Sequence, residues 1–174
     1  HCTSLTGYSG GGKKMIAQYE TERTDPALNA PRPYGLALHH KHLPEMAAIT
    51  GLTAPRTFVP VVADYYAGME TMIPLDLPAL GLTAQQVADA LADYYAGQKM
   101  IAVHPLNEGT DGGFLAANKL AGLDRLEIFC LANPDGTQME LISLFDNLGK
   151  GSSGAAVQCM NLMLGLDETA GLAL

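Results

Sequence analysis

The sequence has no tryptophan, few cysteines and no long apolar run, and each absence narrows the class of protein. Its three cysteines, Cys2, Cys130 and Cys159, lie far apart and form neither a CxxC pair nor a zinc-ligand pattern. We expect reduced, structural thiols in a cytoplasmic protein. No apolar run reaches the ~18 residues that cross a bilayer and no signal-peptide pattern is visible, so we expect no membrane partner.

Charged residues are also scarce. They make up 16% of the chain against 48% apolar residues, which is typical of a folded protein with some apolar surface covered by a second copy or another domain. The formal net charge of −8 argues against nucleic acid, which selects a basic face. A length of 174 residues suits one domain, residues 1–174.

The pattern of apolar and turn residues predicts more strands than helices. Asn133-Pro-Asp-Gly136 separates two alternating segments and predicts a hairpin, and Thr83 with Gln86 predicts a helix N-terminus with a capping box. The fold class is therefore α+β, a largely antiparallel mixed sheet backed by helices. We expect strands at 1–7, 34–38, 56–66, 68–77, 99–103, 124–132 and 137–145, and helices after the glycines at 10–12, at 44–51, at 84–96 and at 149–165.

A cluster of histidines at 39–45 is the first candidate site. On an extended segment His40 and His42 point to the same side. Pro44 starts a helix, and Glu45 can turn back so that its carboxylate fixes one imidazole and frees the other ring nitrogen. We favour proton transfer at His42 over a metal site built from the same residues or a surface cluster without a role.

Two glycine-rich segments are candidate anion sites. In the first, backbone N–H groups of Gly10, Gly11 and Gly12, beside Ser9 and Lys13, suit a phosphate or carboxylate at a helix start. The spacing is not that of a phosphate-binding P-loop, and a flexible connection with solvated lysines is the alternative. The second segment, 147–154, either binds an anion or is an ordinary helix start capped by Ser152 or Ser153.

Four segments together resemble a known family. They are 6–16, 33–46, 58–75 and 146–166, and they resemble the C-terminal domain of the shorter bacterial N-acetyl-gamma-glutamyl-phosphate reductases, enzymes of the semialdehyde dehydrogenase group. The resemblance implies NADPH-dependent reduction of N-acetyl-glutamyl 5-phosphate to N-acetyl-glutamate 5-semialdehyde, with release of phosphate, in arginine biosynthesis. It also implies the semialdehyde-dehydrogenase C-terminal-domain fold.

The resemblance assigns roles to single residues. His42 aligns with the acid–base histidine of the family's HxHxPE segment. Tyr34, His40 and Glu45 align with positions that orient the substrate or the base. Substrate contacts are also expected from Ser9, Gly10, Gly11, Gly12 and Lys13, and contacts with NADP from Gly151 and Gly154, with no metal.

The chain also departs from the family. It contains no Pro-Gly-Cys, the segment of the nucleophilic cysteine, and no glycine fingerprint of a Rossmann domain; Cys159 lies where the family leads us to expect Asn. We therefore expect an excised domain that is inactive alone. Its C-terminal helix, 149–166, is expected to pack on the missing nucleotide-binding domain, which would bind most of the NADP.

Two other functions stay open. The chain can be a non-catalytic dimerisation and anion-binding fragment, or part of a reductase of a related acyl phosphate such as an aminoadipyl derivative, because pockets discriminate one methylene weakly. The apolar strands at 56–75 and 124–145 predict self-association through the sheet, as a homodimer or tetramer.

Overall fold

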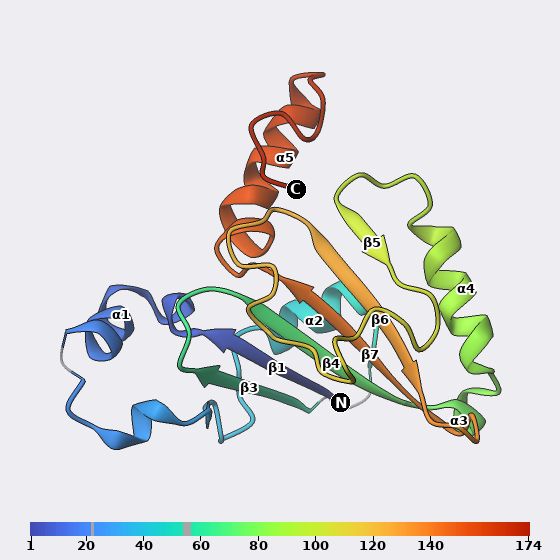
Figure 1. The fold of residues 1–174 in the computed structure, drawn as a ribbon, viewed down its shortest axis with the longest axis horizontal. Helices are drawn as coiled ribbons and strands as arrows, with labels where there is room; N and C mark the ends of the chain where they lie inside the picture. The colour runs from blue at the N-terminus through green and yellow to red at the C-terminus, as the bar shows by residue number, and fades with distance from the viewer. Residues whose placement is uncertain (22, 54–56) are drawn as a thin grey trace.

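The computed structural model describes residues 1–21, 23–53 and 57–174. Their strands form one seven-stranded sheet in the order β2-β3-β1-β4-β7-β6-β5, with helices around it (Figure 1). The strands are β1 (Cys2–Gly7), β2 (Arg32–Pro33), β3 (Phe58–Ala63), β4 (Met69–Asp76), β5 (Ile101–Val103), β6 (Leu126–Ala132) and β7 (Gln138–Phe145). The helices are η1 (Tyr8–Gly11), α1 (Gly12–Glu20), η2 (Pro26–Asn29), α2 (Leu43–Thr50), α3 (Leu77–Leu80), α4 (Ala84–Tyr94), η3 (Gly149–Ser153) and α5 (Gly154–Met163).

Strand pairing confirms the predicted fold class. β4 pairs antiparallel with β1 and β7, β6 antiparallel with β7, and β2 antiparallel with β3, while β1–β3 and β5–β6 are parallel. The predicted hairpin is β6–β7. Although β3 and β4 follow each other in sequence, β1 lies between them. The connection from β3 to β4 therefore passes over the end of β1, and this crossing helps to build the site described below.

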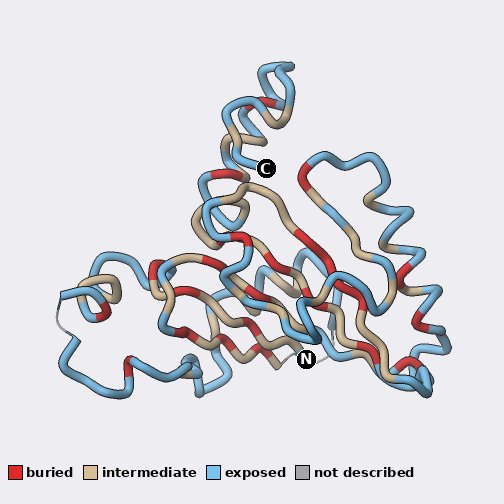
Figure 2. The backbone as a smooth tube through the Cα atoms, in the orientation of Figure 1, coloured by how far each residue is buried: buried red, intermediate tan, exposed pale blue. Residues whose placement is uncertain are grey.

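Two apolar clusters lie on opposite faces of the β7–β6 half of the sheet, and a third, of Tyr19, Leu28 and Val62, lies beside β3. Alternate residues of β6 serve opposite faces, and Phe129 and Cys130 are both fully buried. α4 and Cys130 share one apolar cluster, while Phe129 belongs to a second cluster with Leu120 from the irregular 104–123 segment. Figure 2 shows the buried segments gathered along the strands, whereas α2 has no buried residue and half of α5 is exposed. The buried position of Cys130 agrees with the expectation that it is a structural thiol.

Two local predictions are wrong. Residues 34–38 do not form a strand, since Gly35 and Leu38 have φ of 63° and 57° and Leu38 N–H donates to Gly35 O in a turn. Neither Ser152 nor Ser153 caps α5: η3 is a π-helix that runs directly into α5, and Ser153 Oγ donates to Leu148 O instead.

Other local predictions are confirmed or untested. The capping box of Thr83 and Gln86 is present at the start of α4. The start predicted for the third strand, residue 56, lies outside the described residues. No helix in the described part of the chain is a candidate to span a bilayer.

Candidate functional site

A cleft of about 580 Å³ lies where η1, the 34–42 segment and η3 meet over β1 and β3. It brings together residues from both glycine-rich segments and the histidine cluster, although these segments are separated by up to about 140 positions in the sequence. The predicted site residues that line it are Ser9, Gly10, Gly11, Gly12, Tyr34, His40, His42 and Gly151.

Close backbone contact explains why β1 ends in glycine at this cleft. A Cβ atom on Gly7 would lie 2.4 Å from Tyr66 O, so only glycine lets the β3–β4 connection cross the end of β1. Gly7 N–H donates to Gly68 O at 3.0 Å across this crossing. The chain then turns through η1 into α1, with Gly12 at φ 71°, a conformation that favours glycine.

Aromatic side chains hold His40 in the wall of the cleft. Its ring centroid lies 5.7 Å from Tyr34, 5.1 Å from Phe58 and 4.7 Å from His42. His40 Nδ1 accepts the backbone N–H of His42 at 3.3 Å, so a neutral His40 carries its proton on Nε2. Burial lowers the pKa of His40, and the neighbouring His42 and Lys41 charges lower it further, which favours this neutral form.

His42 lines the same cleft but is exposed. It precedes the first residue of α2, and Glu45 lies in the first turn of that helix. Among the hydrogen bonds of the described residues, none joins the Glu45 carboxylate to His40 or His42. The predicted carboxylate support is therefore not formed: a helix starts at this point as expected, but Glu45 lies exposed in its first turn.

Three predicted site residues lie outside the cleft lining. Glu45 is one. Lys13 borders a separate depression on α1, with Lys14, Ala17 and Gln18. Gly154 is buried, and a Cβ there would lie 2.0 Å from Asp124 Oδ1, so this glycine allows close packing against Asp124.

Sequence reasoning gave Asn147 no role of its own. Asn147 lines the cleft, its Oδ1 accepts Gly68 N–H at 2.8 Å, and its Nδ2 donates to Ser9 Oγ at 2.9 Å. The only sequence signal is a polar Asp-Asn pair directly after the predicted strand that ends at 145. Phe58 and Met69 also line the cleft, and they looked like ordinary strand residues.

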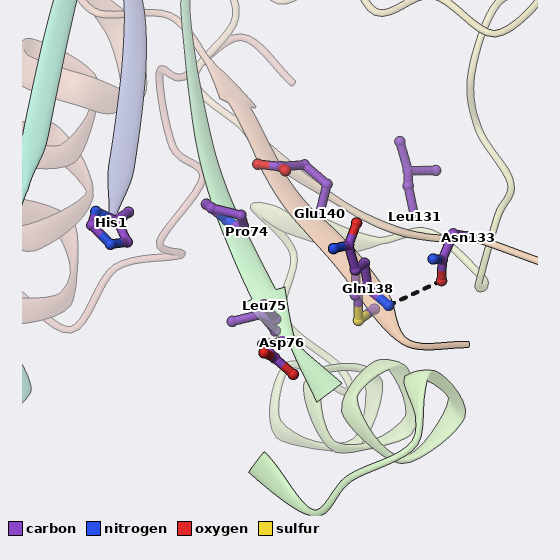
Figure 3. A pocket seen from close by; sticks show the side chains of 9 residues that line it. His1, Pro74, Leu75, Asp76, Leu131, Asn133, Gln138 and Glu140 are labelled. Atoms are coloured by element: carbon purple, nitrogen blue, oxygen red, sulfur yellow. Dashed lines mark hydrogen bonds between the residues drawn. The ribbon is translucent and has the colours of Figure 1, made fainter. Parts of the chain in front are cut away.

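A second cavity, of about 460 Å³, lies over the antiparallel β4–β7 pair. Figure 3 shows Glu140, Pro74 and Asp76 around it, with Gln138 bonded to Asn133. None of the predicted site residues lines it. Burial raises the pKa of Glu140, and two carboxylates disfavour an anionic ligand, so this cavity suits a phosphorylated substrate less well than the cleft.

The described residues offer no metal centre. Within 1–21, 23–53 and 57–174, no group of three or more His, Cys, Asp or Glu side chains is placed to hold an ion. The metal alternative for the histidine cluster therefore lacks a complete ligand set.

The family model described as "Semialdehyde dehydrogenase, dimerisation domain" matches residues 1–147. The chain belongs to this family. This chain spans about half the length of the curated relatives it matches.

Two of those relatives carry the name N-acetyl-gamma-glutamyl-phosphate reductase. The protein from Rhizobium meliloti (strain 1021) is 43% identical over 92% of this chain and 53% of its own length. The reductase 2 of Nostoc sp. (strain PCC 7120) is 39% identical over 97% of this chain and 55% of its own length. The recognition made from the four sequence segments is confirmed.

Solved structures agree on the fold. Aspartate semialdehyde dehydrogenase II from Vibrio cholerae superposes with a TM-score of 0.66 at 15% identity, covering 94% of this chain and 54% of that one. At this identity the likeness establishes the semialdehyde dehydrogenase C-terminal-domain fold and says nothing about the substrate.

Proposed function

We propose that this chain is the acid–base and substrate-holding domain of an NADPH-dependent reductase. The complete enzyme would convert N-acetyl-glutamyl 5-phosphate, NADPH and a proton to N-acetyl-glutamate 5-semialdehyde, NADP⁺ and phosphate, in arginine biosynthesis. The observation that carries the proposal is the cleft that joins His40 and His42 to the glycine segment at 10–12. The names of the relatives support the reaction.

His42 is the proposed acid–base residue. Imidazoles take and give protons near neutral pH, and an exposed ring in the cleft can reach both a reacting group and water. It would take the proton of an attacking thiol and later donate a proton to the forming aldehyde oxygen. Neutral His40 would orient the substrate by donating its Nε2–H to a substrate oxygen.

The substrate would lie against the glycine segment. Backbone N–H groups of Gly10, Gly11 and Gly12, the hydroxyl of Ser9 and the phenol of Tyr34 present donors to phosphate or carboxylate oxygens. Because Lys13, Glu45 and Gly154 lie outside the lining, we leave them out of the proposed contacts.

Two components would come from outside this chain. NADPH supplies the hydride and would be bound mainly by a nucleotide-binding domain, with Gly151 as the contact from this chain because it lines the cleft. The family's Pro-Gly-Cys segment would supply the thiol. We propose that the C-terminal helix, 149–166, packs on that domain, since Leu162, Met163 and Leu164 are 58%, 87% and 65% exposed.

We further propose a homodimer or tetramer, in keeping with the family's description as a dimerisation domain. The three free cysteines suit a reducing compartment, so we place the protein in the cytoplasm. Light scattering at high concentration checks the oligomer, and a strict monomer would contradict it.

The test of function is an NADPH-oxidation assay. The full-length protein should oxidise NADPH only with an acyl phosphate present and release one phosphate per NADPH, while the 174-residue chain alone should not turn over. N-acetyl-glutamyl 5-phosphate and its aminoadipyl homologue are compared by kcat/KM. No turnover by the full-length protein with either substrate would favour a non-catalytic dimerisation and anion-binding module.

A further inference from the structure

Asn147 joins three chain segments at the floor of the cleft. It lies after β7, its Oδ1 accepts the N–H of Gly68 from the β3–β4 connection, and its Nδ2 donates to Ser9 Oγ from η1. The orientation of the amide is fixed, because only its oxygen can accept from a backbone N–H. The nitrogen must therefore face Ser9.

This arrangement determines where the Ser9 hydroxyl proton goes. Ser9 Oγ already accepts from Asn147, so its own O–H has to point elsewhere. Among the hydrogen bonds found within 1–21, 23–53 and 57–174, the Ser9 hydroxyl donates none. Ser9 is only 6% exposed, yet it lines the cleft, so the remaining direction for the proton is into the cleft.

We propose that Asn147 is a positioning residue that turns the hydroxyl of Ser9 toward a phosphate or carboxylate oxygen of the ligand in the cleft. The proposal rests on the proposed function and adds a residue that neither the sequence nor the family resemblance assigned. Asparagine suits this place because its short amide combines an acceptor for Gly68 with a donor for Ser9. An aspartate would keep the bond from Gly68 but would accept the Ser9 proton and withdraw it from the cleft.

The kinetic test uses Ser9→Ala, Asn147→Asp and the double variant in the full-length protein. Ser9→Ala should raise KM for the acyl phosphate about tenfold, the loss of one hydrogen bond to a charged group, with kcat within about twofold. Asn147→Asp should raise KM at least as much. When Ser9 is already alanine, Asn147→Asp should raise KM only through its added charge. That rise in KM should be at least about fivefold smaller than the rise that Asn147→Asp causes in the wild type. Asn133→Asp, the same change in the β6–β7 turn, is the control and should leave KM unchanged.

A binding test separates this proposal from the proposed function. Calorimetry on the same full-length proteins measures affinity for inorganic phosphate and, separately, for N-acetylglutamate. At least one probe should bind the wild type about tenfold more tightly than Ser9→Ala, and this holds even if the wild type reduces no acyl phosphate. The probe that loses affinity identifies the oxygen, phosphate or carboxylate, that Ser9 contacts.

Three outcomes overturn the proposal: a wild-type KM and unchanged affinity for both probes in Ser9→Ala, additive effects of the two substitutions, or an equal rise in KM in Asn133→Asp. If Asn147→Asp fails to fold, Asn147→Ala takes its place in the same set of variants. Ser9→Ala should itself lower the thermal unfolding midpoint, because it leaves Asn147 Nδ2 without its acceptor.

Discussion

Two histidines at opposite ends of the sheet have opposite surroundings. His104, directly after β5, has Nε2 3.1 Å from Glu127 Oε2 and its ring stacked on Phe129 at a centroid distance of 4.2 Å. His42, beside β3, lies in an open cleft with no carboxylate bonded to it among the described residues. A carboxylate that fixes an imidazole is often found at catalytic sites. Here the histidine with such a partner is His104, which lies far from the proposed site.

The network around His104 explains its structural character. Glu127 is 5% exposed and also accepts from Lys119 Nζ at 3.0 Å and Arg125 Nε and Nη2 at 3.1 and 2.9 Å. These bonds tie the 104–123 segment to β6 above the Phe129 cluster. No proposed substrate residue takes part. Among the described residues, the lack of a hydrogen-bonded carboxylate distinguishes the proposed catalytic histidine from His104.

The largest expected effect is on catalysis, from His42→Asn. In the full-length protein this change should lower kcat by about 10²–10⁴, the usual contribution of a general acid–base group, with little change in the thermal unfolding midpoint because His42 is exposed. His104→Asn is the matched control and should do the reverse, lowering stability while turnover stays near the wild-type rate. If His104→Asn abolished turnover and His42→Asn did not, the two assignments would have to be exchanged.

The next effect is on stability, from Glu127→Gln. Loss of hydrogen bonds from charged donors to a buried carboxylate should lower the free energy of unfolding by about 1.5–3 kcal/mol at pH 7, measured by urea denaturation of the 174-residue chain. Glu140→Gln is the control. It replaces a carboxylate whose pKa burial raises, so it should leave stability unchanged or slightly increase it.

The effect of Glu127→Gln should also depend on pH. Burial raises the pKa of Glu127, but hydrogen bonds from Lys119, His104 and Arg125 outweigh it and hold the pKa below its ordinary value. A carboxylate whose pKa is lowered by folding stabilises the folded state at pH values above its unfolded-state pKa. This stabilisation is lost as the pH falls through its folded-state pKa. The difference between Glu127→Gln and wild type should therefore shrink below the ordinary glutamate pKa of about 4.3. A constant difference down to pH 3 would mean that the bonds are not the cause.

Sequence patterns predicted the sheet better than they predicted the contacts of the site. The β6–β7 hairpin and the Thr83 capping box depend on neighbours in sequence, and both were predicted. Tertiary contacts were not: the carboxylate near His42 in sequence bonds neither imidazole, and Asn147 meets Ser9 only because β1 enters the sheet between β3 and β4. Gly154 showed the same limit, since a glycine before a helix looks alike whether it faces a ligand or a buried carboxylate.

The two glycine-rich segments give a smaller, matched contrast. Gly154→Ala should destabilise the chain by about 1–3 kcal/mol through overpacking, because its Cβ would collide with Asp124. Gly10→Ala should leave stability nearly unchanged, since a Cβ there lies 3.4 Å from Thr6 Oγ1 and 3.6 Å from Asn147 Nδ2, close to ordinary contact distances. Thermal unfolding of both variants measures the difference. Equal destabilisation would mean that the first segment is also a packing element.

The smallest expected effect comes from Glu45→Gln, and it tests the comparison most directly. If a carboxylate bonded to the ring were needed at the catalytic end as it is at His104, removing this charge would change the pH profile of kcat/KM and lower the rate severalfold. The geometry predicts otherwise: Glu45 is exposed and lies in the first turn of α2 without a hydrogen bond to either imidazole among the described residues. The rate should stay within about twofold of wild type, the range expected when no catalytic contact is lost. A displaced pH profile would show that the carboxylate reaches His42 once substrate and the nucleotide-binding domain are in place.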